Sequence, residues 1–261
     1  MVDLSIVIDG SGLIIVFIGT AGCGKTSLTY AFGEWLKREL DVEVSYINMD
    51  PGVYKTPYIP SYDVREIVRV EKLMEDGLGP NGAMIRAAEI IEENIDRISV
   101  EIGSVNSEFT LVDTPGQMEL FLFRRMGPKL VEKIGKHSST VSVYIIDPDL
   151  ASSPSGLAIS LTLPLIARLR LKVPTVSVIN KSDISEIVRV EEFMSNLKNL
   201  EEKIRIEEAG LIVDLASRYI ELINEFSKTM RIVKTSAKTG EGMSDLYTLV
   251  HEALCECGDL M

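Results

Sequence analysis

The chain has 261 residues, of which 46% are hydrophobic and 25% are charged, a balance that suits one large α/β domain or two small ones. Its formal net charge of −12 disfavours nonspecific binding to nucleic acid, since the phosphate backbone would repel it. The longest apolar stretches, such as 156–167, are too short to cross a bilayer, and the N-terminus lacks the basic and apolar parts of a secretion signal. We therefore expect a cytoplasmic protein with no direct nucleic-acid partner and no membrane partner.

Six segments are predicted to be buried strands, because most are rich in Val and Ile and are bounded by polar or turn residues. They are Leu13–Ile18, Glu43–Asn48, Phe109–Asp113, Val141–Asp147, Pro174–Asn180 and Arg231–Thr235. Helix-periodic segments lie between them, so we predict an α/β fold with a mostly parallel central sheet flanked by helices. The run Leu4–Ile8 could add an edge strand. Ligands of such sheets bind beyond the carboxyl ends of the strands.

The first predicted strand leads into the stretch Gly19 to Thr26, GTAGCGKT, which fits the phosphate-loop pattern G-x-x-x-x-G-K-[ST]. A helix-periodic stretch from Ser27 to Leu40 follows, and a strand, a glycine-rich turn and a helix N-terminus together form a phosphate cradle. Lys25 is expected to reach the β- and γ-phosphates, and the Thr26 hydroxyl to ligate Mg²⁺. We therefore predict a P-loop NTPase that binds phosphate through Gly22, Cys23, Gly24, Lys25, Thr26 and Ser27.

The second predicted strand is followed by Asp50 and Pro51. A carboxylate at this position would face the phosphates from the side opposite the end of the third strand. It could hold a Mg²⁺-bound water or orient the attacking water, or it could be an aspartate before a proline that caps a helix or a turn. Both interpretations of Asp50 stay open at this stage.

Two long connections are predicted to be helical insertions in a single domain that spans residues 1–261. The first, about 54–98, contains two amphipathic helices, Asp63–Glu75 and Asn81–Ile98, joined by a glycine-rich turn. The second, about 185–226, is also predicted to be helical.

The third predicted strand ends in Asp113-Thr114-Pro115-Gly116, which matches the D-x-x-G pattern of GTP-binding proteins. An aspartate here can hold Mg²⁺ through a water, and the Gly116 amide can contact the γ-phosphate. The pattern is weak alone, because turns after strands often produce it. Its place on a strand downstream of a phosphate loop favours the functional interpretation.

The fifth and sixth predicted strands end in elements typical of guanine recognition, NKSD at 180–183 and TSAK at 235–238. Guanine presents an N1–H and an NH₂ group side by side, and the Asp183 carboxylate can accept both, whereas adenine would leave it unpaired. Lys181 could cover the base, Asn180 could brace neighbouring loops, and a backbone N–H of the second element could bind guanine O6. We therefore predict a site for GTP and GDP formed by Asn180, Lys181, Asp183, Ser236, Ala237 and Lys238.

The chain has three cysteines and two histidines, which is too few to favour a zinc site or a histidine-dependent nucleophile. Cys255 and Cys257 form a C-x-C pair without a second pair, and Cys23 is expected to serve as a small residue of the phosphate loop.

In their order, these motifs resemble those of the GPN-loop GTPases. The name-giving tripeptide is present at Gly79-Pro80-Asn81, and the stretch 113–119, DTPGQME, is similar to the family's extended third motif. The resemblance covers about residues 13–254. It implies a Mg²⁺-dependent GTPase that forms a homodimer in archaea, with each GPN loop reaching toward the partner's nucleotide. For eukaryotic relatives it implies a link to RNA polymerase assembly and nuclear import.

The resemblance also implies roles for individual positions. Those at the phosphates and Mg²⁺ are Gly24, Lys25 and Thr26, and those that would orient or activate water are Asp50, Gln117 and Glu119. Asn81 would project toward the phosphates. The residues themselves favour a stiff turn here, because Gly79 permits an unusual backbone angle and Pro80 fixes the next one.

Three other functions fit part of the sequence. A deviant phosphate-loop ATPase often has a lysine where this chain has Thr20, and it would not need the motif at 180–183. A nucleotide kinase would need an arginine-rich lid, and a helix would place Arg124 and Arg125 on different faces. An assembly chaperone that binds GTP almost without turnover is not separable from a GTPase switch by sequence, and single-turnover hydrolysis would distinguish them.

Overall fold

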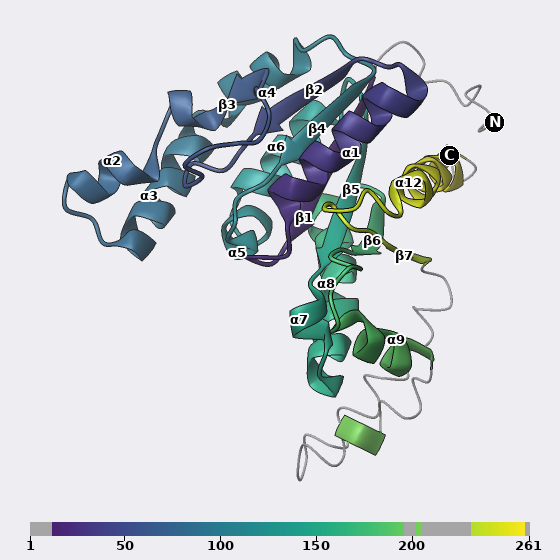
Figure 1. The fold of residues 1–261 in the computed structure, drawn as a ribbon. Helices are drawn as coiled ribbons and strands as arrows, with labels where there is room; N and C mark the ends of the chain where they lie inside the picture. The colour runs from purple at the N-terminus through teal and green to yellow at the C-terminus, as the bar shows by residue number, and fades with distance from the viewer. Residues whose placement is uncertain (1–11, 196–201, 205–230, 259–261) are drawn as a thin grey trace.

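A parallel seven-stranded sheet forms the centre of the computed structural model, which describes residues 12–195, 202–204 and 231–258 (Figure 1). The strand order is β3-β2-β4-β1-β5-β6-β7. The strands are β1 (Leu13–Gly19), β2 (Val44–Asn48), β3 (Tyr62–Asp63), β4 (Phe109–Asp113), β5 (Ser139–Ile146), β6 (Thr175–Ile179) and β7 (Ile232–Lys234). Because every pairing is parallel, all carboxyl ends of the strands lie at one edge of the sheet.

The strand β1 shows how the sheet forms two cores. It lies between β4 and β5, and all seven of its residues are buried. Side chains alternate along a strand, so Leu13, Ile15 and Phe17 enter one core while Ile14, Val16 and Ile18 enter the other. This continuous apolar pattern is the one expected for a parallel strand covered on both sides.

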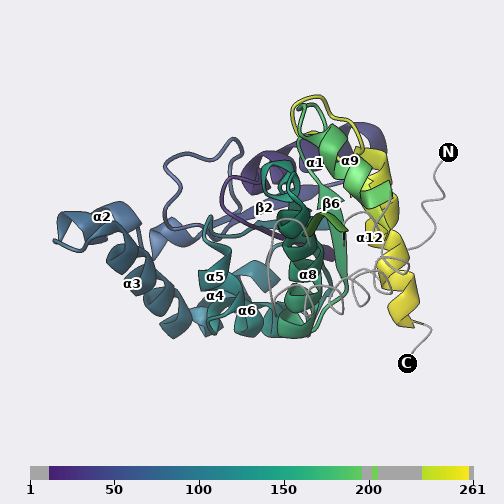
Figure 2. The same cartoon turned by 90° about the horizontal axis from the view of Figure 1, so that it is seen from below.

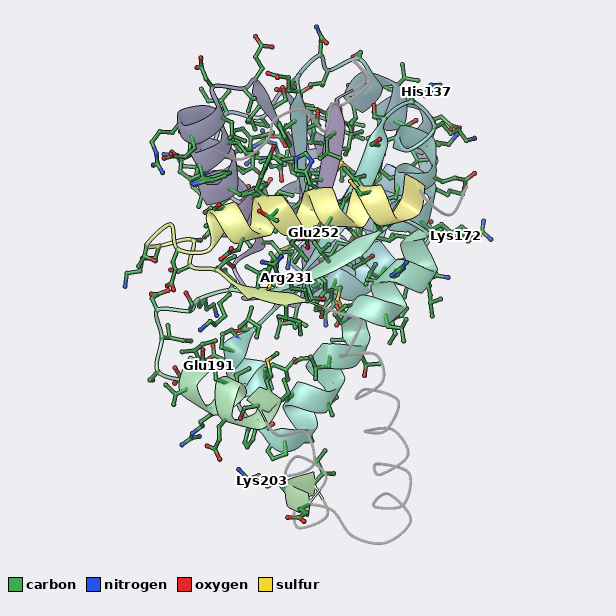
Figure 3. The ribbon with its side chains drawn as sticks, turned by 90° about the vertical axis from the view of Figure 1, so that its right-hand side faces the viewer. His137, Lys172, Glu191, Lys203, Arg231 and Glu252 are labelled. Carbon is green, nitrogen blue, oxygen red and sulfur yellow. The ribbon has the colours of Figure 1, made fainter. Side chains whose placement is uncertain are left out.

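In the part of the chain that the structure describes, two helices cover one face of the sheet. They are α1 (Lys25–Leu40) and α12 (Met243–Gly258), whose apolar residues share a core with Leu13, Ile15 and Phe17. An ion pair of 2.9 Å between Arg231, just before β7, and Glu252 of α12 joins that helix to the edge of the sheet (Figure 3).

The other face is covered by a larger set of helices, which share the second core. They are α2 (Val70–Glu75), α3 (Pro80–Glu93), α4 (Ile95–Gly103), α5 (Met118–Leu122), α6 (Met126–Ile134), α7 (Pro148–Ala151), α8 (Pro154–Leu171) and α9 (Ile187–Ser195). Figures 1 and 2 both show α2 and α3 projecting away from the rest of the molecule. Within the described residues, no helix has the length and apolar character needed to span a membrane.

The predicted fold class is confirmed, and the predicted strands differ from the observed ones by at most two residues at either end. The strand β3 was not predicted, because two residues are too few for a periodicity. The predicted edge strand Leu4–Ile8 and most of the insertion 185–226 lie outside the described residues.

Both helices predicted in the first insertion are wrong in extent. Only Val70–Glu75 of the first is α-helical, and a 3-10 turn at Val64–Glu66 precedes it. The second is divided at Asn94, whose side-chain amide donates to the Ile90 carbonyl at 2.8 Å. Asparagine competes locally for backbone groups in this way, and apolar periodicity does not record it.

Candidate functional site

The loop between β1 and α1 has the backbone geometry of a phosphate cradle. Gly22 has a φ of 83° and Gly24 a φ of 90°, in the left-handed region that favours glycine. A Cβ atom at Gly24 would lie 2.5 Å from the Asn180 side-chain nitrogen, so only glycine fits there. Gly24 provides no side-chain cap to α1, which leaves the first N–H groups of that helix available to an anion.

The Lys25 side chain is buried at the centre of this loop. Its ammonium group donates to the backbone oxygens of Gly19 at 2.8 Å and Thr20 at 2.9 Å. It also donates to the Gly116 oxygen at 3.3 Å, so it links the phosphate loop to the D-x-x-G loop. Of the other predicted phosphate-loop residues, Cys23 is buried, Thr26 is half-buried and Ser27 is exposed in the first turn of α1.

Asp113 ends β4 and is fully buried. Its Oδ2 accepts a hydrogen bond of 2.8 Å from the Tyr58 hydroxyl, while Oδ1 is buried without a hydrogen-bond partner among the described residues. Burial raises the pKa of the Asp113 carboxyl to about 6, and the nearby Thr26 and Tyr58 hydroxyls act against that rise. An unpartnered carboxylate oxygen beside a threonine hydroxyl fits Mg²⁺, which prefers oxygen ligands.

Asp50 connects the end of β2 to the D-x-x-G loop. Its Oδ1 accepts from the Gly52 amide at 2.8 Å, and its Oδ2 accepts from the Gly116 amide at 3.0 Å. One oxygen therefore caps the turn that contains Pro51, which agrees with the turn-capping interpretation of the sequence. The other oxygen lies on the amide that was expected to meet the γ-phosphate, so the two interpretations of Asp50 are compatible.

Gln117 and Glu119 are exposed at the start of α5, next to Gly116 in the chain. The predicted phosphate end of the site thus lies at the ends of three neighbouring strands, β2, β4 and β1, together with the N-terminus of α1 that follows the loop after β1.

Asn180 connects the phosphate loop to the predicted base-binding loops. Its side-chain nitrogen donates to the Cys23 carbonyl at 3.0 Å, and its side-chain oxygen accepts from the Ala237 amide at 3.3 Å. Lys181 follows with a positive φ of 60° and donates to Asp147 Oδ1 at 3.1 Å. The structure therefore places the motifs at 180–183 and 235–238 side by side and against the phosphate loop.

The Asp183 carboxylate is held by the loop after β7, which contains the motif Ser236-Ala237-Lys238 and is called the S-A-K loop. Its Oδ1 accepts from the Ser236 hydroxyl at 2.6 Å, and Lys238 lies 3.7 Å from its Oδ2. The Ser236 hydrogen bond lowers the pKa of Asp183, with a smaller contribution from Lys238, so the carboxylate is charged near neutral pH. A charged acceptor fixed in this way suits a ligand with two neighbouring N–H donors.

The turn that holds Gly79, Pro80 and Asn81 lies at the tip of the α2–α3 hairpin, and all three residues are exposed. Gly79 does not use the backbone freedom that glycine permits, since its φ is −67°, and the left-handed residue of the turn is Gly77 with a φ of 97°. The α2–α3 hairpin that carries this turn projects away from the rest of the molecule in both views (Figures 1 and 2).

Sequence reasoning missed two residues of the site, Tyr58 and Asp147. Tyr58 lies in a loop without any recognisable motif, and no local pattern indicates its contact with Asp113. Asp147 follows β5 directly and pairs with Lys181, so the rule that polar residues after parallel strands form the site could have identified it.

The strand–loop–helix cradle, its lysine and the D-x-x-G loop define this protein as a P-loop NTPase with base-binding elements of the guanine type. A family model described as "Conserved hypothetical ATP binding protein" matches residues 17–256. The GPN-loop GTPase PAB0955 of Pyrococcus abyssi is 37% identical over 95% of this chain and 100% of its own length. The crystal structure of its apo form superposes with a TM-score of 0.83, covering 93% of this chain and 98% of that one.

A more distant relative is GPN-loop GTPase 1 of Saccharomyces cerevisiae, which is 27% identical over 93% of this chain, and the chain spans 66% of that protein's length. The chain belongs to the GPN-loop GTPase family, which makes it an enzyme of the GTPase class. This membership decides against the ATPase and kinase alternatives. Arg124 and Arg125 lie in the turn between α5 and α6.

Proposed function

We propose that this protein is a Mg²⁺-dependent switch that binds GTP and GDP and hydrolyses GTP. The observation that supports this most directly is the position of Asn180, which bonds the phosphate loop at Cys23 and the S-A-K loop at Ala237. One side chain thereby joins a phosphate cradle to a fixed carboxylate acceptor, Asp183. A nucleotide with guanine at one end and phosphates at the other matches both parts. We infer that the chain works as one domain.

At the base end, Asp183 would accept from N1–H and NH₂ of guanine, and Lys181 would cover the ring. The hydrogen bond from Ser236 orients the carboxylate before the base arrives. Calorimetry with GDP, a slowly hydrolysed GTP analogue and ATP tests this part. Equal affinity for adenine and guanine nucleotides would contradict it.

At the phosphate end, Lys25 would leave the loop carbonyls for the phosphates, and Thr26 and Asp113 would hold Mg²⁺, with Asp50 nearby. The ion, when bound, would neutralise charge that develops on the phosphate oxygens. Asp50, Gln117 and Glu119 would orient the attacking water. Single-turnover hydrolysis in the presence and absence of Mg²⁺ tests this part, and it separates a GTPase switch from a GTP-binding assembly chaperone with negligible turnover.

We further infer a homodimer in which the exposed turn at Gly79–Asn81 of one subunit approaches the nucleotide of the other. The hairpin that carries this turn also exposes apolar side chains, namely Met74, Leu78 and Ile85. A group of exposed apolar residues on one projecting hairpin marks a contact surface more than scattered ones would. A protein client of the kind implied by the family, related to RNA polymerase assembly, would act through such a dimer.

A further inference from the structure

Tyr58 is buried in a loop that has strongly exposed residues on both sides of it. The loop 49–61 connects β2 to β3 and exposes Tyr54 by 84% and Ile59 by 92%, whereas Tyr58 is 6% exposed. Its ring stacks on Tyr46 of β2, with centroids 4.7 Å apart and planes at 14°. The Thr56 hydroxyl donates to the Tyr58 carbonyl at 2.8 Å, which holds the backbone of the loop at this point.

The Tyr58 hydroxyl makes a specific contact with Asp113. It donates to Oδ2 at 2.8 Å and leaves Oδ1 without a partner among the described residues. One hydrogen bond to one oxygen of a carboxylate sets which oxygen remains available. The stacked Tyr46 does not share this task, because its own hydroxyl donates to Glu34 of α1 at 3.0 Å.

We propose that Tyr58 is a positioning residue of the nucleotide site, which holds Asp113 so that Oδ1 is presented to the Mg²⁺ that accompanies a guanine nucleotide. This inference rests on the proposed function. It also gives the loop 49–61 a part in the site, since the same segment carries Asp50, which binds the Gly116 amide. Partners that orient a ligating group typically contribute 10- to 100-fold to metal affinity.

The positioning role belongs to the Tyr58 hydroxyl and not to its ring, because a phenylalanine would fill the same space and keep the stack on Tyr46. A purely structural role predicts a loss of stability without a change in the response to Mg²⁺. A positioning role predicts a change in that response specifically.

The test compares Tyr58→Phe with Tyr46→Phe, a matched control that removes a neighbouring hydroxyl bonded to Glu34 instead of Asp113. Binding of a fluorescent GDP to the full chain is measured while Mg²⁺ is titrated, and again in EDTA. For Tyr58→Phe the half-saturating Mg²⁺ concentration should rise about tenfold, with little change in the affinity measured in EDTA. The Tyr46→Phe control should follow the wild-type Mg²⁺ curve, and Asp113→Asn should lose most of the response.

A Mg²⁺ curve for Tyr58→Phe that coincides with wild type, or that shifts to lower concentration, overturns the proposal. If Tyr58→Phe does not fold, Thr56→Val decides, because it loosens the Tyr58 carbonyl and keeps every ring. Its curve should then move in the same direction by a smaller factor, and no movement overturns the proposal. A wild-type protein that binds no guanine nucleotide would contradict the proposed function instead, so the two failures are distinguishable.

Discussion

Removing the Asp50 carboxylate should raise the affinity of the protein for GTP relative to its affinity for GDP. In the structure the Gly116 amide donates to Asp50 Oδ2 at 3.0 Å. If a γ-phosphate oxygen is to accept from this amide, Asp50 must first release it. GDP lacks the γ-phosphate and leaves the Asp50 contact in place, so the contact lowers the affinity for GTP but not the affinity for GDP.

The size of this effect follows from the type of bond. A hydrogen bond to a charged group contributes about 1.5–3 kcal/mol, and the half-buried position of Asp50 favours the lower value. Since 1.4 kcal/mol corresponds to a factor of ten, Asp50→Ala should raise the affinity for a GTP analogue relative to GDP roughly tenfold. Hydrolysis should fall at the same time, by roughly 10²- to 10⁴-fold if Asp50 orients water.

The assay is competition of GDP and a slowly hydrolysed GTP analogue against a fluorescent nucleotide. Glu132→Ala is the charge-matched control, because Glu132 lies on α6 with an exposed side chain and its removal changes the net charge equally. The reasoning is refuted if the GTP-to-GDP affinity ratio of Asp50→Ala equals that of Glu132→Ala or is smaller.

Three further predictions concern the base, the dimer and stability. Asp183→Asn should weaken GDP binding by about 30- to 1,000-fold, from the loss of roughly 2–4 kcal/mol, and should shift preference toward xanthine nucleotides; calorimetry that shows unchanged guanine affinity would contradict this. Three alanines in place of Gly79–Asn81 should lower turnover but not nucleotide affinity. Mixing this variant with Lys25→Ala should partly restore activity if the turn acts across subunits, whereas no restoration would mean that the turn acts within its own subunit. Burial lowers the pKa of His251, so as pH falls the unfolded chain binds this proton before the folded one does, and stability should decline below about pH 6.5. His251→Phe should reduce the fall in melting temperature between about pH 7 and 5. An unchanged fall would exclude His251 as its cause.

Local sequence patterns were enough to predict the class of fold and the candidate parts of the site. Buried strands, a glycine-rich loop and a helix start are local patterns, so Leu13 to Leu40 predicts a phosphate cradle without knowledge of any distant contact. The same holds for the motifs that begin at Asp113 and Asn180. Because parallel strands end at one edge, their order along the chain was enough to predict that these motifs meet.

Which atoms of these motifs contact one another depends on the packing of distant segments. Tyr58 and Asp113 are 55 residues apart, and Asp50 and Gly116 are 66 apart, so no local periodicity contains either pair. The strand order brings them together, since β4 lies between β1 and β2 and carries Asp113 to the loop that follows β2. Side-chain contacts of this kind depend on packing between distant segments, and for that reason the role of Tyr58 is visible in the fold and absent from the motifs.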